Sequence, residues 1–171
     1  MIAKANTSHP GTTKLLAELA LAAVQATDLP PATVQLIYRT SHADGERLVA
    51  DPRLGATGYT GSPAAGLALK RAADAAGKPV YLELSSINPV VILPGALEER
   101  GDKLADEFAG SCLMGTGQFC TNPGLVLLVA GAATERFIAG LVERFKSAPA
   151  GTLLSSRVAK ALVESFTTLQ G

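Results

Sequence analysis

The chain has 171 residues, with 15 basic and 15 acidic side chains and 47% hydrophobic residues. The zero net charge argues against nucleic acid as a main partner, because phosphate binding needs a basic face. The hydrophobic content allows a sizeable core, belonging to one ordinary domain or to parts of two. No apolar run reaches the roughly 18–20 residues that a membrane-spanning helix needs, so we expect no membrane partner.

The two cysteines, Cys112 and Cys120, are too few for a disulfide scaffold. The start of the chain lacks the long apolar segment of a signal peptide, so we expect reduced thiols and a cytoplasmic protein. No His, Cys or Asp cluster has metal-ligand spacing, and we predict no metal. Both ends of the chain interrupt expected elements, which predicts a piece of a larger protein.

In the first half, strands alternate with helices. We expect strands at 2–4, 34–38, 56–60 and 80–84, and helices at 15–24, up to residue 50, and 63–76. Thr12 and Thr13 are the expected cap of the first helix. This alternation is typical of βαβ units and predicts an α/β fold with an open parallel sheet and helices on both faces.

The second half has longer helices. We expect strands at 89–93 and 125–129, and helices at 98–113, 134–146 and 157–168. Leu84, Ser85 and Ser86 form a small, turn-like boundary. We therefore predict one partial domain at residues 1–84 and a second at residues 85–171.

Cys120 lies on a turn between two apolar segments, with Gly115 and Gly117 before it and Pro123 behind it. A cysteine that only packs usually lies inside an apolar run. Cys112, within the preceding helix, is the expected packing residue. The Gln118 amide and the Thr121 hydroxyl could stabilise a thiolate here. Cys120 is therefore a candidate nucleophile, and an inert loop thiol is the alternative.

Glu83 interrupts an apolar strand, Val80 to Leu84. A carboxylate that enters a core is disfavoured in its charged form, which suits it to proton transfer near neutral pH. The sequence therefore makes Glu83 a candidate general base. A strand-end glutamate that points to solvent or pairs with a basic residue is an equal alternative.

Two further features could bind a nucleotide. Gly61, Ser62 and Gly66 lie at a strand–helix junction, where exposed N–H groups and the helix dipole suit a pyrophosphate. Lys4 ends the first strand, and no acidic residue follows it in the turn that contains Thr7. A carboxylate there would repel a 2′-phosphate, so its absence favours NADP. A tight turn and a solvated lysine are the alternatives.

Three segments resemble, in order and approximate spacing, motifs of the aldehyde dehydrogenase superfamily. They are Tyr59-Thr60-Gly61-Ser62 with Gly66, Leu82-Glu83-Leu84 with Asn88-Pro89, and Gly117-Gln118-Phe119-Cys120. The segments 84–89 and 114–124 are most similar to the subgroup of α-ketoglutaric semialdehyde (2,5-dioxovalerate) dehydrogenases, which have Ser-Ser-Ile where most of the superfamily has Gly-Gly-Lys. The resemblance covers essentially the whole chain.

The resemblance implies a Rossmann-like cofactor domain followed by part of a catalytic domain. Cys120 would be the nucleophile and Glu83 the general base. Lys4 and Thr7 would bind the adenosine ribose or its phosphate, and Gly61, Ser62 and Gly66 would line the pyrophosphate site. Thr7 stands where NAD-preferring members have a glutamate, so the expected cofactor is NADP, with NAD possible.

The implied reaction is oxidation of an aldehyde, 2,5-dioxovalerate in this subgroup, to its acid through a thiohemiacetal and a thioester. The implied full-length protein is a homo-oligomer. The family's side-chain oxyanion donor, its glutamate for the nicotinamide ribose and its oligomerisation strand would fall outside this chain. We therefore expect the chain alone to have little or no dehydrogenase activity.

Three other interpretations compete with this one. The chain could be a non-catalytic nucleotide-binding or folding fragment of such an enzyme. It could be a cofactor-free cysteine acyl-transfer enzyme, although His9 and His42 lack an acidic residue placed to orient them. It could also be purely structural, with ordinary reactivity at Cys120.

Overall fold

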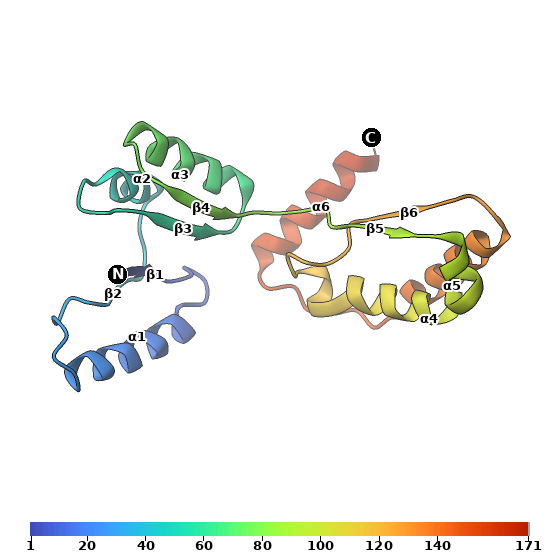
Figure 1. The fold of residues 1–171 in the computed structure, drawn as a ribbon, viewed down its shortest axis with the longest axis horizontal. Coiled ribbons are helices and arrows are strands. Elements are labelled where there is room, and N and C mark those ends of the chain that lie inside the picture. The colour runs from blue at the N-terminus through green and yellow to red at the C-terminus, as the bar shows by residue number, and fades with distance from the viewer. Residues whose placement is uncertain (171) are drawn as a thin grey trace. The chain divides into compact units, whose positions relative to one another are not determined.

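A computed structural model describes residues 1–170 (Figure 1). The chain divides into two compact units, Met1–Glu83 and Leu84–Gly171, which we call unit 1 and unit 2. The sequence placed the boundary between residues 84 and 85. The observed division, between Glu83 and Leu84, lies one residue before the predicted one.

Unit 1 is built from parallel strands joined by helices. Its elements are β1 (Ile2–Lys4), α1 (Pro10–Gln25), β2 (Gln35–Ile37), α2 (His42–Ala50), β3 (Thr57–Thr60), α3 (Pro63–Ala75) and β4 (Val80–Glu83). Strand β1 pairs in parallel with β2, and β3 pairs in parallel with β4. Each pair is thus a βαβ unit, with α1 and α3 as the crossovers.

Helix α1 begins at Pro10, with His9 as its N-cap. The predicted cap at Thr12 and Thr13 is therefore wrong. Pro10 suits the first helical position because its ring fixes φ and it has no N–H to leave unpaired. Just ahead of it, the Asn6 side chain accepts hydrogen bonds from the N–H groups of Ser8 and His9, at 2.9 and 3.1 Å, and closes the turn.

Unit 2 also contains a parallel strand pair. Its elements are β5 (Pro89–Ile92), α4 (Pro94–Leu113), the 3₁₀ helix η1 (Met114–Gly117), β6 (Leu125–Leu128), α5 (Ala132–Ser147) and α6 (Ser156–Gln170). Strands β5 and β6 are parallel and in register from Pro89 opposite Leu125 to Ile92 opposite Leu128. Helix α4 begins four residues before the predicted start, at another first-turn proline, and is kinked at Arg100.

The connected hydrophobic core lies in unit 2. It consists of Ile92, Leu97, Ala105, Ala109, Phe137 and Leu141, contributed by β5, α4 and α5. The rings of Phe108 and Phe137 meet edge to face, with centroids 6.3 Å apart. In unit 1 the buried apolar residues are smaller on average: Ala5, Val24, Val49 and Ala73.

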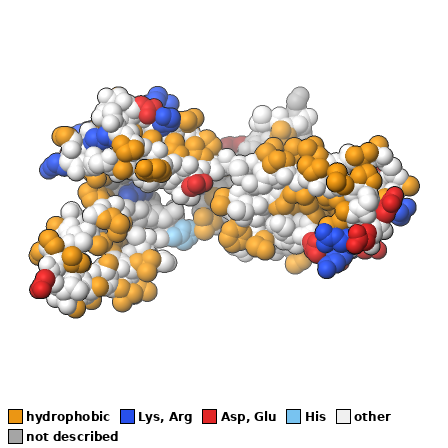
Figure 2. Space-filling model, in the orientation of Figure 1, with side chains coloured by type: hydrophobic (Ala, Val, Ile, Leu, Met, Phe, Trp, Pro, Cys, Tyr) orange, Lys and Arg blue, Asp and Glu red, His pale blue; other side chains and the backbone are white. Residues whose placement is uncertain are grey.

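The described strands form three two-stranded parallel sheets. The α/β class and the parallel pairing expected from the sequence are confirmed, but the strands do not form one continuous sheet. As a result, several strand side chains are open to solvent, including Tyr81, which is 69% exposed, and Val91, which is 64% exposed. Figure 2 shows hydrophobic side chains spread over the visible surface. Within residues 1–170, no helix is both long enough and apolar enough to cross a bilayer.

Candidate active site

The start of the β5–β6 pair brings two sequence motifs together. Because the two strands are parallel and begin in register, the segments that precede them lie side by side. The N–H of Gly124 donates to the Ile87 carbonyl at 2.8 Å, which extends the pairing by one step. A Cβ atom at Gly124 would lie 2.8 Å from that carbonyl oxygen, so only glycine fits this approach. The contact joins the motif after Glu83 to the motif around Cys120.

Cys120 lies on a turn, residues 117–123, which we call the cysteine turn. The chain reaches it from α4 through η1, where Gly115 and Gly117 have φ of 59° and 71°. Glycine adopts this left-handed region without the steric cost of a Cβ atom. Thr116, between them, is also left-handed, with φ of 61°, so three successive residues of this conformation lead into the cysteine turn. The Cys120 side chain is exposed.

Two side chains from the segment before β5 hold the carbonyl of Cys120. The Ser86 hydroxyl donates to it at 2.9 Å, and Nδ2 of Asn88 donates to it at 2.8 Å. Nδ2 of Asn88 also donates to the Asn122 carbonyl at 3.0 Å. The sequence reasoning missed both residues as parts of this site. The signal was available in the two Asn-Pro pairs, 88–89 and 122–123, which mark turns ahead of both strands.

Asn122 ties the cysteine turn to the end of helix α4. Its Nδ2 donates to the carbonyls of Cys112 and Met114, at 3.0 and 2.9 Å. Carbonyls in the last turn of a helix have no partner within the helix, so a side-chain amide stabilises this end. Asn88 and Asn122 therefore connect the cysteine turn to β5 and to α4 respectively.

Gln118 does not serve the thiol as the sequence suggested. Its Nε2 donates to the Gly115 carbonyl at 2.9 Å, and its Oε1 accepts from the N–H of Leu154 at 2.8 Å. The Gln118 amide thereby connects Gly115 of η1 to Leu154 in the segment before α6. Gln118 shapes the cysteine turn, and Thr121 is exposed beside Cys120.

Cys112 is half-buried near the end of α4, and its Sγ lies 3.7 Å from the Pro123 carbonyl as a weak donor. Burial raises the pKa of the Cys112 thiol, because the charged form loses hydration. A smaller fraction of the Cys112 thiol is therefore ionised at neutral pH than of an ordinary exposed cysteine. Cys112 accordingly has the environment of a packing residue.

Glu83 is the last residue of β4 and of unit 1, opposite Thr60 in the β3–β4 pair. Its carbonyl accepts from the N–H of Gly61 at 3.0 Å, which ties the Gly61 junction to the end of β4. The Glu83 side chain is exposed. The premise that the core desolvates this carboxylate is therefore wrong for unit 1, because side chains alternate along the strand and Leu82 is turned inward instead.

The proposed cofactor residues all lie in unit 1. Lys4 ends β1, and its Nζ donates to the Thr7 hydroxyl at 3.1 Å, so a cation and a hydroxyl lie together on the surface. Ser62 is the N-cap of α3, with Pro63 following it, and Gly66 is buried in the first turn of that helix. A Cβ atom at Gly61 would meet the Tyr59 hydroxyl, which lies at the far end of a side chain that can turn aside.

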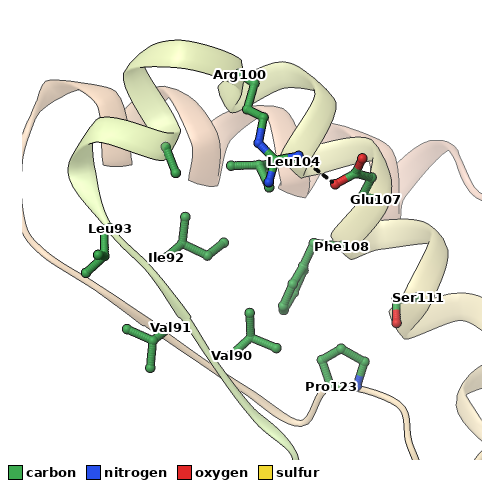
Figure 3. Close-up of a pocket in the computed structure, with 11 residues that line it drawn as sticks. Val90, Val91, Ile92, Leu93, Arg100, Leu104, Glu107, Phe108, Ser111 and Pro123 are labelled. Carbon is green, nitrogen blue, oxygen red and sulfur yellow. Dashed lines mark ion pairs between the residues drawn. The ribbon is translucent and has the colours of Figure 1, made fainter.

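Unit 2 also contains an apolar groove of about 470 Å³ between β5 and α4. Figure 3 shows Ile92, Leu104 and Phe108 around it. The charged side chains in its lining, Arg100 and Glu107, form an ion pair of 3.6 Å with each other. The groove continues the hydrophobic core and offers hydrocarbon contacts; its lining contains neither Cys120 nor Glu83.

Comparison with known proteins gives a consistent result. The profile of the aldehyde dehydrogenase family matches residues 1–162. Alpha-ketoglutaric semialdehyde dehydrogenase 2 of Azospirillum brasilense is 42% identical over 163 residues, which are 94% of this chain and 31% of that protein. Alpha-ketoglutaric semialdehyde dehydrogenase of Acinetobacter baylyi is 32% identical over 171 residues, 99% of this chain and 32% of that protein. The chain thus spans about a third of the length of these curated relatives.

Solved structures show the same fold. The NAD-dependent aldehyde dehydrogenase from Sinorhizobium meliloti superposes with a TM-score of 0.80 at 22% identity, covering 98% of this chain and 33% of that one. The glyceraldehyde-3-phosphate dehydrogenase of Methanocaldococcus jannaschii, solved with NADP, gives a TM-score of 0.72 at 20% identity, with 85% and 31% coverage.

Proposed function

The chain belongs to the aldehyde dehydrogenase family, and on that premise we propose that it supplies the nucleophile and the general base of an enzyme that oxidises an aldehyde to its acid. The observation that carries the proposal is the exposed Cys120 thiol on a turn whose carbonyl is held by Ser86 and Asn88. A nucleophile needs access to its substrate and a fixed direction of attack. Cys112, half-buried in α4, lacks this access.

In the proposed reaction the Cys120 thiolate attacks the aldehyde carbon and forms a C–S bond, which leaves a negative oxygen on that carbon. The N–H of Cys120 itself can donate to this oxygen. A bound nicotinamide would supply the acceptor for the hydride that this carbon loses, and Cys120 would then hold the acyl group as a thioester. Glu83 takes a proton from water, the water attacks the thioester, and the acid leaves as the Cys120 thiolate reforms.

Glu83 suits the hydrolytic step because it lies at the exposed end of β4, where its carboxylate can reach water. Its backbone is fixed by the hydrogen bond from Gly61. A carboxylate at the end of a rigid strand can accept a proton from a water molecule. The proposed role of Glu83 as the base therefore depends on its exposure to water and not on the desolvation expected from the sequence.

The proposed cofactor is NADP. Lys4 and Thr7 present a cation and a hydroxyl without a carboxylate between them, which fits a phosphate better than a bare ribose. The start of α3 at Ser62, next to Gly61, offers N–H groups and the positive end of a helix dipole to a pyrophosphate. The buried Gly66 lets this helix pack closely in unit 1.

The preference for NADP can be tested with Thr7→Glu. The new carboxylate would repel a 2′-phosphate and accept a hydrogen bond from a 2′-hydroxyl, so we expect the ratio of affinity for NADP to affinity for NAD to fall about tenfold or more. Calorimetric titration with each cofactor measures both affinities. Thr12→Glu, which adds the same charge to the surface of α1, is the control. If Thr7→Glu and Thr12→Glu gave the same ratio of affinity for NADP to affinity for NAD, a 2′-phosphate site at Thr7 would be excluded.

The proposed substrate is 2,5-dioxovalerate, because the two relatives described above act on α-ketoglutaric semialdehyde by name. The test follows reduction of NADP by the protein that carries this chain, with 2,5-dioxovalerate and with simple aliphatic aldehydes. We expect preference for 2,5-dioxovalerate, and loss of more than about a thousandfold of the rate in Cys120→Ser. A Cys112→Ser variant controls for general damage to the thiols.

We also propose that this protein is a cytoplasmic homo-oligomer.

For the 171-residue chain by itself, we propose little or no turnover. Its span of about a third of the curated relatives favours a non-catalytic nucleotide-binding or folding fragment as the second candidate. NADP binding without NADPH formation would support that candidate for the isolated chain. Detectable NADP reduction by the 171-residue chain would overturn the proposed inactivity.

A further inference from the structure

The carbonyl of Cys120 accepts two side-chain hydrogen bonds although the residue is exposed. Ser86 and Asn88, which donate them at 2.9 and 2.8 Å, come from the segment between β4 and β5, more than 30 positions earlier in the chain. An exposed turn carbonyl can be satisfied by water, so these bonds are not needed to avoid a desolvation penalty. Their effect is to fix the peptide that follows Cys120 and to place two donor dipoles on the Cys120 carbonyl.

The orientation of the Asn88 amide follows from its partners. Nδ2 faces two carbonyl oxygens, those of Cys120 and Asn122, which can only accept. Oδ1 lies 2.9 Å from the Ser86 hydroxyl, whose single proton is shared between this oxygen and the Cys120 carbonyl. Each polar atom of the amide therefore has a partner of the right kind. A carboxylate at position 88 would set an oxygen against two other oxygens.

The backbone at Asn88 has φ of 45°, a left-handed conformation that asparagine, aspartate and glycine tolerate better than other residues. Exchanges among these three types therefore change the side chain while the backbone conformation stays accessible. Variants with aspartate or glycine at position 88 can therefore test the Asn88 amide without changing the conformation of the turn.

We propose that Ser86 and Asn88 are positioning residues for Cys120: they fix the direction of its side chain and favour its thiolate through the donor dipoles that they place on its carbonyl. The inference rests on the proposed function for the role of Cys120 and extends that role to two residues before β5. Without these donors water would take their place at the carbonyl, but it would neither hold the Cys120 peptide in one orientation nor provide fixed donor dipoles there.

The test measures the rate at which iodoacetamide alkylates Cys120 in the 171-residue chain as a function of pH, by mass spectrometry of the Cys120 peptide. The variants are Ser86→Ala, Asn88→Asp and Asn88→Gly, with Ser86→Thr as the conservative rescue. Ser85→Ala, a neighbouring exposed serine, is the matched control. Thermal unfolding of each variant identifies those that fail to fold.

For Asn88→Asp we expect the pH of half-maximal rate to rise by about one unit, because a negative charge now lies near the thiolate. Ser86→Ala and Asn88→Gly should raise it by a few tenths of a unit, and Ser86→Thr should restore the original value. Ser85→Ala should leave it unchanged. A purely structural role would lower the unfolding temperature and leave the pH midpoint of every folded variant at the original value, and that result would overturn the inference.

This outcome is independent of dehydrogenase activity. If Cys120→Ser kept full NADP reduction, the proposed function would fail, while the alkylation profiles would still decide the role of Ser86 and Asn88. Conversely, unchanged midpoints in Ser86→Ala and Asn88→Asp would remove the positioning role and leave the proposed function untouched.

Discussion

Two asparagines arrange the site at the scale of single residues. Asn88 joins the cysteine turn to the start of β5, and Asn122 joins it to the end of α4. Each asparagine precedes a proline, and each Pro begins or shortly precedes a strand of the β5–β6 pair. The sequence singled out Cys120 because of its turn, but it could not reveal that a segment more than 30 positions away supplies the hydrogen bonds.

The difference between the two thiols gives a prediction at this scale. Cys120 is exposed, whereas burial raises the pKa of Cys112. At pH 7.5 we expect Cys120 to be alkylated faster than Cys112, because Cys120 is accessible to the reagent and burial disfavours the thiolate of Cys112. Peptide mass spectrometry after timed exposure to iodoacetamide gives both rates. Equal rates, or a faster Cys112, would contradict the assignment of Cys112 as the packing cysteine.

At the scale of elements, helices α4 and α5 determine the stability of unit 2. Besides their shared core, they are joined by an ion pair in which Nε of Arg144 lies 2.5 Å from Oδ1 of Asp106. Arg144 also donates to the carbonyls of Gly140 and Asp102, at 3.0 and 3.2 Å. The guanidinium therefore connects α5 to α4 at two acceptors, Asp106 and Asp102, and Gly140 is an acceptor within α5 itself.

The ion pair predicts a pH dependence. The hydrogen bond from Arg144 holds the pKa of Asp106 below its usual range. The stabilisation is thus complete above the ordinary aspartate pKa of about 3.9 and is lost as the pH falls through the lowered value. We expect Asp106→Asn to lower the denaturant midpoint at pH 7, and the difference from the original protein to shrink towards pH 3. The effect is modest, because the pair is exposed.

Glu99→Gln, on the exposed side of the same helix, is the control for this experiment. Its denaturant midpoint should stay close to that of the original protein at both pH values. A difference for Asp106→Asn that stayed constant between pH 7 and pH 3 would mean that the substitution acts through something other than the charge of Asp106.

The elements also show how far the sequence alone could lead. Periodicity and residue composition predicted each strand and each α-helix described, because these are local properties, but they did not predict the 3₁₀ helix η1. The start of α1 was misplaced because Pro10 overrides Thr12 and Thr13, and the kink at Arg100 has no sequence marker that we recognised. The exposure of Glu83 depends on strand pairing, which is a long-range property.

At the scale of the whole molecule, the apolar side chains are unevenly buried. Helix α1 exposes Leu15, Leu16 and Leu19 by 58–61%, and α6 exposes Leu162, Val163, Phe166 and Leu169 by 56–87%. Helix α6 has no buried residue among those described. Since helices in proteins gain most of their stability from packing an apolar face, α1 and α6 are the least secured elements.

Hydrogen exchange of the 171-residue chain tests this difference. We expect the slowest amide exchange in α4, α5, β5 and β6, which contain or flank the core of unit 2, and fast exchange in α1 and α6. Mass spectrometry of peptides after timed labelling resolves the elements. Protection of α6 equal to that of α4 would show that its apolar face is covered in solution.

The most direct test of the account is to trap the acyl group on the protein. In the protein that carries this chain, Glu83→Gln should still form the thioester but hydrolyse it slowly, because no base activates water. After a short reaction with 2,5-dioxovalerate and NADP, the account predicts that the Cys120 peptide gains the mass of the aldehyde less two hydrogen atoms. A Cys120 peptide of unchanged mass while NADPH is formed, or an adduct on Cys112, would contradict the assignment of Cys120 as the nucleophile.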